Sequence, residues 1–131
     1  MPSFEGDTLT HNRFYTAQGT NHPMILHFFS SDCRDCPRTL SAAQSVYSSS
    51  SDLVVVGISE DASPARTQVL VDHLGIHFPV VLDEDGRIAR EYQVTEMPAV
   101  FVVSPYGRVH WLGGAEANED SLRAAVSDTQ R

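Results

Sequence analysis

Short apolar runs alternate along the chain with segments of helical spacing. Two runs, 24–30 (MILHFFS) and 53–59 (LVVVGIS), contain no acidic or basic residue apart from one histidine, and β-branched and aromatic side chains dominate them. Runs of this kind are typical of strands that are buried on both faces of a sheet. A third run, FPVVLD at 78–83, has the same character. The pattern predicts three strands inside one sheet.

Helical spacing separates these strands. The segment 38–47 (RTLSAAQSVY) places Leu40, Ala43 and Tyr47 on one helical face. A second helix is predicted to start at Ser63-Pro64 and to stop at Gly75, which are usual start and stop signals. Its predicted apolar face consists of Val69, Leu70, His73 and Leu74.

The last third of the chain predicts a hairpin and a helix. The segment 99–114 contains two apolar runs joined by the turn SPYG, as in an antiparallel hairpin. The segment 118–129 predicts a helix with acidic residues in its first turn. Between the third strand and the hairpin, DEDG at 83–86 reads as a solvated turn, because it lacks the alternating ligands and distal glutamate of a calcium loop.

The predicted order is β-α-β-α-β-β-α, after an irregular opening of about twenty residues. Strands that alternate with helices and then form a hairpin indicate a three-layer α/β fold with a mixed sheet. A chain of 131 residues fits one domain, so residues 1–131 are expected to form a single domain.

Composition narrows the possible partners. The net charge is −8, from 17 acidic and 9 basic residues, and every basic residue is arginine. Without lysine there is no phosphate-binding P-loop lysine and no Schiff base. Acidity argues against nucleic acid, and no run approaches the ~20 apolar residues that membrane insertion requires. We therefore expect neither partner.

The only two cysteines lie in HFFSSDCRDCPRTL, residues 27–40, directly behind the first predicted strand. Two cysteines are too few for a disulfide scaffold, and a loop this short adds little stability, which favours a chemical role. Cys33 is predicted at the start of the following helix, where free N–H groups and the helix dipole stabilise a thiolate. Cys36, three residues later, is within reach to close a disulfide with Cys33.

At this point the sequence resembles the thioredoxin superfamily, and within it the TlpA-like thiol:disulfide oxidoreductases, which are related to the AhpC/TSA redoxins. The resemblance includes SFEGDTLTHNRFY near the start and LGIHFPVVLDEDGRIAREYQVTEMPAVFVVSPYGRVHWLGG in the second half. It implies a thioredoxin fold that exchanges disulfides with protein substrates, more often as a reductant that a partner protein reduces in turn. The redox-active disulfide Cys33–Cys36 would need no organic cofactor and no metal.

The resemblance also implies roles for single residues. Cys33 would be the nucleophile and Cys36 the resolving thiol. Pro98 would be the family's cis-proline, in a loop that faces the cysteines. A cis bond there would turn the backbone of Met97 outward, so that a substrate peptide pairs with it as an added strand.

Two further residues are candidate proton acceptors. His27 lies six residues before Cys33, where thioredoxins carry a buried acid; we favour a hydrogen-bonded core histidine over a proton acceptor for Cys36. Glu60, just past the second strand, resembles the site-proximal glutamate of some TlpA-like reductases, although a solvated loop carboxylate explains it equally well.

The surroundings of the cysteines depart from the family pattern. Asp32 replaces a tryptophan, and Arg34-Asp35 replaces a dipeptide that ends in proline. Asp32 is in a position to cap the helix, and its charge and that of Arg34 shift the pKa of Cys33 in opposite directions. These departures affect the choice of substrate more than the chemistry.

Three other functions fit the same stretch less well. It also resembles the copper-binding segment of the Sco family, with Cys33 and Cys36 as metal ligands, but Glu96 stands where that family has a histidine, so a third ligand is missing. CPRT resembles the peroxiredoxin site, yet Cys33 and Phe29 occupy the places of its threonine and proline. A redox-inert binding module requires that both thiols be unreactive.

We expect a monomer. Two locations stay open: periplasmic or otherwise extracytoplasmic if an export signal or anchor was removed before Met1, and cytoplasmic if Met1 is the native start.

Overall fold

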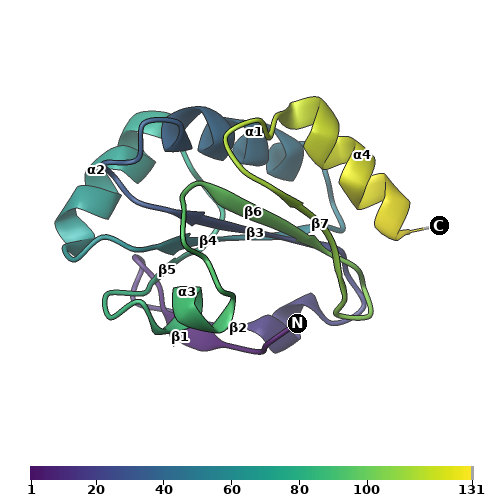
Figure 1. Cartoon of the computed structure of the whole chain (residues 1–131), viewed down its shortest axis with the longest axis horizontal. Helices are drawn as coiled ribbons and strands as arrows, with labels where there is room; N and C mark the ends of the chain where they lie inside the picture. The colour runs from purple at the N-terminus through teal and green to yellow at the C-terminus, as the bar shows by residue number, and fades with distance from the viewer. Residues whose placement is uncertain (131) are drawn as a thin grey trace.

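A computed structural model of the chain describes residues 1–130. Its elements form three layers, of which the sheet is the middle one (Figure 1). The strands are β1 (Glu5–Asp7), β2 (Arg13–Tyr15), β3 (Met24–Phe29), β4 (Val54–Ser59), β5 (Val80–Leu82), β6 (Ala99–Val103) and β7 (Val109–Gly113). The helices are α1 (Cys36–Ser48), α2 (Pro64–Leu74), α3 (Arg87–Glu91) and α4 (Glu119–Thr129), with a 3-10 helix η1 (Thr16–Gly19).

The central sheet has the strand order β5-β4-β3-β6-β7. Strand β3 pairs in parallel with β4 and antiparallel with β6, so the sheet is mixed, as the sequence predicts. Strands β3 and β4 are buried along almost their whole length, because helices or loops cover both faces of the sheet. The predicted hairpin is β6–β7, and its strands are antiparallel.

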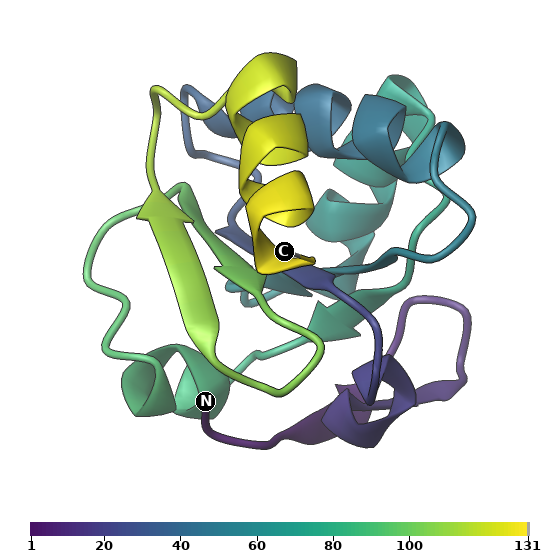
Figure 2. The same cartoon turned by 90° about the vertical axis from the view of Figure 1, so that its right-hand side faces the viewer.

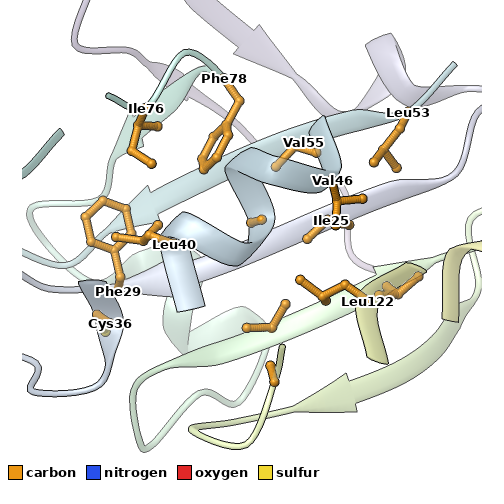
Figure 3. Packing of buried hydrophobic residues seen from close by; sticks show 14 of the residues in the cluster. Ile25, Phe29, Cys36, Leu40, Val46, Leu53, Val55, Ile76, Phe78 and Leu122 are labelled. Carbon is orange, nitrogen blue, oxygen red and sulfur yellow. The ribbon is translucent and has the colours of Figure 1, made fainter. Parts of the chain in front are cut away.

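Each face of the sheet has its own core, because successive side chains of a strand point to opposite faces. Helices α1, α2 and α4 cover one face (Figures 1 and 2), where Ile25 and Phe29 pack with Leu40 and Leu122 (Figure 3). On the other face α3 and the N-terminal segment enclose a second, more aromatic core. That core contains Phe4, Phe14, Phe28, Tyr92 and Phe101.

The predicted apolar face of helix α2 is confirmed only in part: Leu70 and Leu74 are partly buried and pack against the core, but the face is shifted. Thr67 and Val71 are buried, whereas Val69 is 71% exposed and His73 is also exposed. Hydrogen bonds from the hydroxyl of Thr67 inside the protein decide this orientation over the simple apolar pattern. The predicted limits of the helix, Pro64 and Gly75, are confirmed, and Gly75 ends it in the left-handed conformation, with φ 66°.

Helix α3 was not predicted, and the solvated turn assigned to DEDG is wrong at its first residue. Asp83 is 3% exposed, and its carboxylate accepts hydrogen bonds from the N–H groups of Ile88 and Ala89, each at 3.0 Å. A side-chain acceptor at these otherwise free donors stabilises a five-residue helix that is too short to show a helical period.

The prediction of an irregular N-terminal segment is also wrong. Strands β1 and β2 form a small antiparallel sheet in which Gly6 is paired with Phe14. The guanidinium of Arg13 joins them by ion pairs with Glu5 at 3.1 Å and Asp7 at 2.8 Å. Strands of three residues are too short to show the alternating pattern by which strands are recognised.

Candidate redox site

Cys33 and Cys36 are joined by a disulfide bond, with their Cα atoms 5.4 Å apart. The two residues differ in accessibility: Cys36 is completely buried in the core beneath α1, whereas Cys33 is partly exposed. A partner molecule therefore reaches the sulfur of Cys33 first.

Helix α1 begins at Cys36, one turn later than the sequence predicts, so Cys33 lies in the turn before the helix. The reason is Pro37, which has no N–H to donate to the carbonyl of Cys33 in the i to i−4 pattern. That carbonyl instead accepts from the N–H of Cys36, at 3.3 Å. Cys33 remains beside the helix N-terminus, where backbone dipoles favour a thiolate.

Asp32 does not cap the helix, contrary to the expectation. Its carboxylate accepts a hydrogen bond from the hydroxyl of Ser30 at 2.7 Å. The residue before the helix is Asp35, whose side chain makes no capping bond but accepts from Arg38 at 3.3 Å. The later start of α1 leaves Asp32 too far from the first helical N–H groups.

The loop with Met97 and Pro98 leaves the sheet at the same edge as the cysteine segment. Phe28 near the end of β3 is paired with Ala99 at the start of β6, so the residues after Phe28 and those before Ala99 emerge together. The Met97–Pro98 peptide bond is cis, Pro98 is buried and Met97 is 37% exposed. Their contact with a substrate stays a prediction.

Helix α1 is tied to the segment that follows β7. Arg38 donates to the carbonyl of Ala115 at 2.6 Å. A Cβ atom added to the neighbouring Gly114 would lie 3.5 Å from the carbonyl oxygen of Pro98. The first turn of α1, this segment and the Pro98 loop are therefore close neighbours around the site.

His27 is completely buried on the α1 side of β3, as the favoured interpretation of a hydrogen-bonded core histidine requires. Its Nε2 lies 2.8 Å from the hydroxyl of Thr39, and its Nδ1 has no hydrogen-bond partner among residues 1–130. Burial lowers the pKa of His27 from 6.5 to about 4. The imidazole is therefore neutral near pH 7; whether it receives a proton from Cys36 stays a prediction.

Glu60 follows β4 and lies beside the end of β3, where its N–H donates to the carbonyl of Phe29 at 2.8 Å. Its carboxyl pKa is raised from 4.5 to about 9, mainly by burial and also by the neighbouring Asp83 and Asp85, while Arg90 opposes the shift. The Oε2 atom has no hydrogen-bond partner in the described part of the chain. Glu60 therefore carries a proton near pH 7, unlike a solvated loop carboxylate.

Sequence reasoning missed Asp61, which is only 8% exposed. It accepts hydrogen bonds from the N–H and the hydroxyl of Ser31, at 2.8 and 2.9 Å. The one signal in the sequence is its place just after the second predicted strand. In a parallel sheet this position lies beside the residues that follow the first predicted strand, among them Ser31.

A shallow groove lies between the segment just before Cys33 and helix α2. Ser31 and Asp32, just before Cys33, form one wall, and the exposed Val69 lies on the other. The groove is lined by Ser31, Asp32, Arg66, Val69, Leu70 and His73. A larger groove lies between the N-terminal segment and α2, but none of residues 30–36 lines it.

Two other kinds of site are absent from residues 1–130. No group of three or more His, Cys, Asp or Glu side chains is arranged to hold a metal ion. None of the helices has the length and apolar character needed to cross a membrane.

Comparisons with known proteins identify the family. The model of the AhpC/TSA family matches residues 1–112. Sporulation thiol-disulfide oxidoreductase A of Bacillus subtilis is 31% identical over 90 residues, which cover 65% of this chain and 54% of that protein. The chain spans about half the length of the curated relatives it matches.

Solved structures show the same fold. A secreted disulfide oxidoreductase of Mycobacterium tuberculosis, homologous to E. coli DsbE, superposes with a TM-score of 0.87 at 24% identity and covers 95% of each chain. A thiol:disulfide interchange protein of the thioredoxin family from Chlorobium tepidum gives a TM-score of 0.87 at 22% identity, over 99% of this chain and 94% of that chain. The chain therefore belongs to the AhpC/TSA family and has a thioredoxin fold, as the resemblance implied.

Proposed function

We propose that the chain is a thiol:disulfide oxidoreductase that acts on protein substrates through Cys33 and Cys36. The observation that carries the proposal is the asymmetry of the disulfide. Cys33 is partly exposed in the turn before α1, and Cys36, the first residue of α1, is completely buried. The names of its relatives support the same chemistry.

The reaction starts from the reduced pair. The thiolate of Cys33 attacks one sulfur of a substrate disulfide, forms a mixed disulfide and releases the other substrate sulfur as a thiolate. Cys36 then attacks the sulfur of Cys33, which closes the Cys33–Cys36 bond and releases the second substrate thiolate. Two electrons pass to the substrate, and the exchange itself requires neither an organic cofactor nor a metal.

The surroundings of Cys33 provide places for the substrate chain. Met97, which is 37% exposed and lies at the same edge of the sheet, is the candidate for backbone pairing with an extended segment. The groove beside Ser31 and Val69 accepts a side chain next to the substrate cysteine. Met97 lies at the end of the sheet where the cysteine segment emerges, and the groove includes Ser31 and Asp32 just before Cys33, so we expect one bound segment to reach both.

Proton transfer is assigned to the neighbouring polar groups. Glu60, protonated near pH 7, is the candidate donor to a leaving thiolate. His27, neutral and joined through Thr39 to the first turn of α1, is the candidate acceptor for the proton of Cys36. Of the two, we place more weight on Glu60, because burial strongly disfavours a charged His27.

We infer that the chain works as a reductant, supplied with electrons by a reducing partner protein. The reduction potential of the pair decides the direction: a value near −270 mV indicates a reductant and one near −120 mV an oxidant. Copper titration of the reduced protein separates this function from copper binding, since an oxidoreductase needs no stoichiometric metal.

The proposed function is tested with insulin as the disulfide substrate. Cys33→Ser is expected to abolish insulin reduction, and Cys36→Ser to accumulate mixed disulfides that are visible on non-reducing gels. Ser41→Ala, a substitution on α1 away from the disulfide, serves as the control. If both cysteine variants kept full activity, the assigned roles would be wrong.

A further inference from the structure

A buried carboxylate connects the segment before Cys33 to the rest of the protein. Asp61 directs Oδ1 toward Ser31, from which it accepts two hydrogen bonds, one from the backbone and one from the hydroxyl. Bonds to a charged acceptor are stronger than neutral ones, and burial limits competition from water. Ser31 is therefore held at a defined position two residues before Cys33.

The other oxygen of Asp61 is held from α2. Its Oδ2 accepts from the hydroxyl of Thr67 at 2.7 Å, and that hydroxyl is also 2.7 Å from the Oγ of Ser59. The backbone N–H of Asp61 in turn donates to Ser59 at 3.2 Å. Thr67 and Ser59 are completely buried, so the carboxylate is fixed between β4 and α2.

Few other side-chain hydrogen bonds reach this segment from outside. Within residues 30–32, Ser30 and Asp32 bond to each other, and the N–H of Cys33 donates to the carbonyl of Ser30 at 3.3 Å. These bonds are internal to the turn and do not fix it relative to the sheet. Among the described residues, Asp61 alone supplies side-chain hydrogen bonds from another element to Ser31.

We propose that Asp61 is a positioning residue of the redox pair. By fixing Ser31 it keeps the sulfur of Cys33 within reach of Cys36, which raises the effective concentration of one thiol toward the other. The biological purpose of this role rests on the proposed function. The role itself can be measured without a protein substrate, because the equilibrium between dithiol and disulfide belongs to the protein alone.

The test is that equilibrium, measured against mixtures of reduced and oxidised glutathione. Asp61→Ala removes the acceptor of Ser31, and we expect the equilibrium constant for disulfide formation to fall about tenfold, which corresponds to a potential about 30 mV more positive. Asp61→Asn keeps an oxygen for Ser31 and presents an N–H₂ group to the hydroxyl of Thr67, so it is expected to stay within about twofold of the wild type.

Matched threonine variants control for stability. Thr67→Val removes one partner of Asp61 and is expected to shift the equilibrium in the same direction as Asp61→Ala, but less. Thr16→Val removes a buried hydroxyl that accepts from the N–H of Phe4. Thr16 lies beside Met24 at the start of β3, the end of that strand opposite the cysteine segment, so the variant is expected to leave the equilibrium unchanged. Urea unfolding of each variant reports its stability separately.

Two results would overturn the proposal. A wild-type equilibrium in a folded Asp61→Ala protein would show that the segment needs no anchor. An equal shift in Asp61→Asn and Asp61→Ala would show that an oxygen acceptor for Ser31 at this position does not set the equilibrium, which contradicts the positioning role. Failure of the wild type to reduce insulin would instead contradict the proposed function and leave this measurement valid.

Discussion

The Nε2 atom of His27 lies 2.8 Å from the hydroxyl oxygen of Thr39, and this contact joins β3 to the first turn of α1 inside the core. The same hydroxyl is 3.2 Å from the carbonyl of Cys36, to which it can donate. All three residues are completely buried. A polar link thus runs from the central strand to the buried cysteine, through a part of the core that is otherwise apolar.

Replacement of His27 is expected to reduce the dependence of stability on acid. Because burial lowers the pKa of His27 to about 4, the unfolded chain binds a proton between pH 6.5 and 4 that the folded protein does not bind, and stability falls as pH falls through this range. His27→Gln lacks this proton. The advantage of the wild type in the free energy of unfolding is therefore expected to shrink between pH 7 and pH 4.5 in urea titrations, and an advantage that grew on acidification would contradict the burial argument.

Glu60 is expected to act in the opposite sense. Its pKa is raised from 4.5 to about 9, so the folded protein keeps a proton that the unfolded chain releases, and stability is lost as pH rises between these values. In Glu60→Gln this loss is absent, so the stability of the variant relative to the wild type should increase from pH 5 to pH 9 in urea unfolding. The exposed Glu96→Gln is the matched control. A constant difference between Glu60→Gln and the wild type across the range would show that Glu60 does not hold a proton.

The groove beside Cys33 predicts a difference between large and small substrates. Val69→Asp places a charge on its exposed apolar wall and is expected to slow insulin reduction severalfold, with the rate toward glutathione disulfide nearly unchanged, since only a polypeptide covers the groove. Val109→Asp, on β7, is the control because Val109 is also exposed, at 45%. Equal slowing of both substrates by Val69→Asp would point to a change at the thiols themselves.

The core beneath α1 predicts a large loss of stability on truncation. Leu40 is completely buried and packs in the cluster that contains Cys36 and Phe29 (Figure 3), so Leu40→Ala is expected to cost about 2–5 kcal/mol of the free energy of unfolding. Leu112→Ala, at a position that is 59% exposed, is expected to change it by less than about 0.5 kcal/mol. Chemical denaturation of both variants measures the contrast, and a loss below about 1 kcal/mol in Leu40→Ala would show that the core repacks.

The long elements could be predicted from the sequence because each has an unambiguous local pattern. The apolar runs that became β3 and β4 are buried over nearly their full length, and the signals at Pro64 and Gly75 bound α2 as predicted. The short elements could not be predicted. Helix α3 depends on the side chain of Asp83, and β1 and β2 depend on each other, so neither has a pattern of its own that a window of sequence reveals.

The same distinction holds at the site: features that depend on local sequence could be predicted, and features that depend on long-range contacts could not. The sequence alone identified the cysteine pair, its place between a strand and a helix, and the residues that the resemblance marks for test, since all of these depend on spacing along the chain. The tertiary structure decided which cysteine is exposed, that Pro37 delays the start of α1, and that Asp61 and Thr67 hold Ser31. It also decided that Glu60 carries a proton and His27 does not, because burial and neighbours distant in sequence determine a pKa.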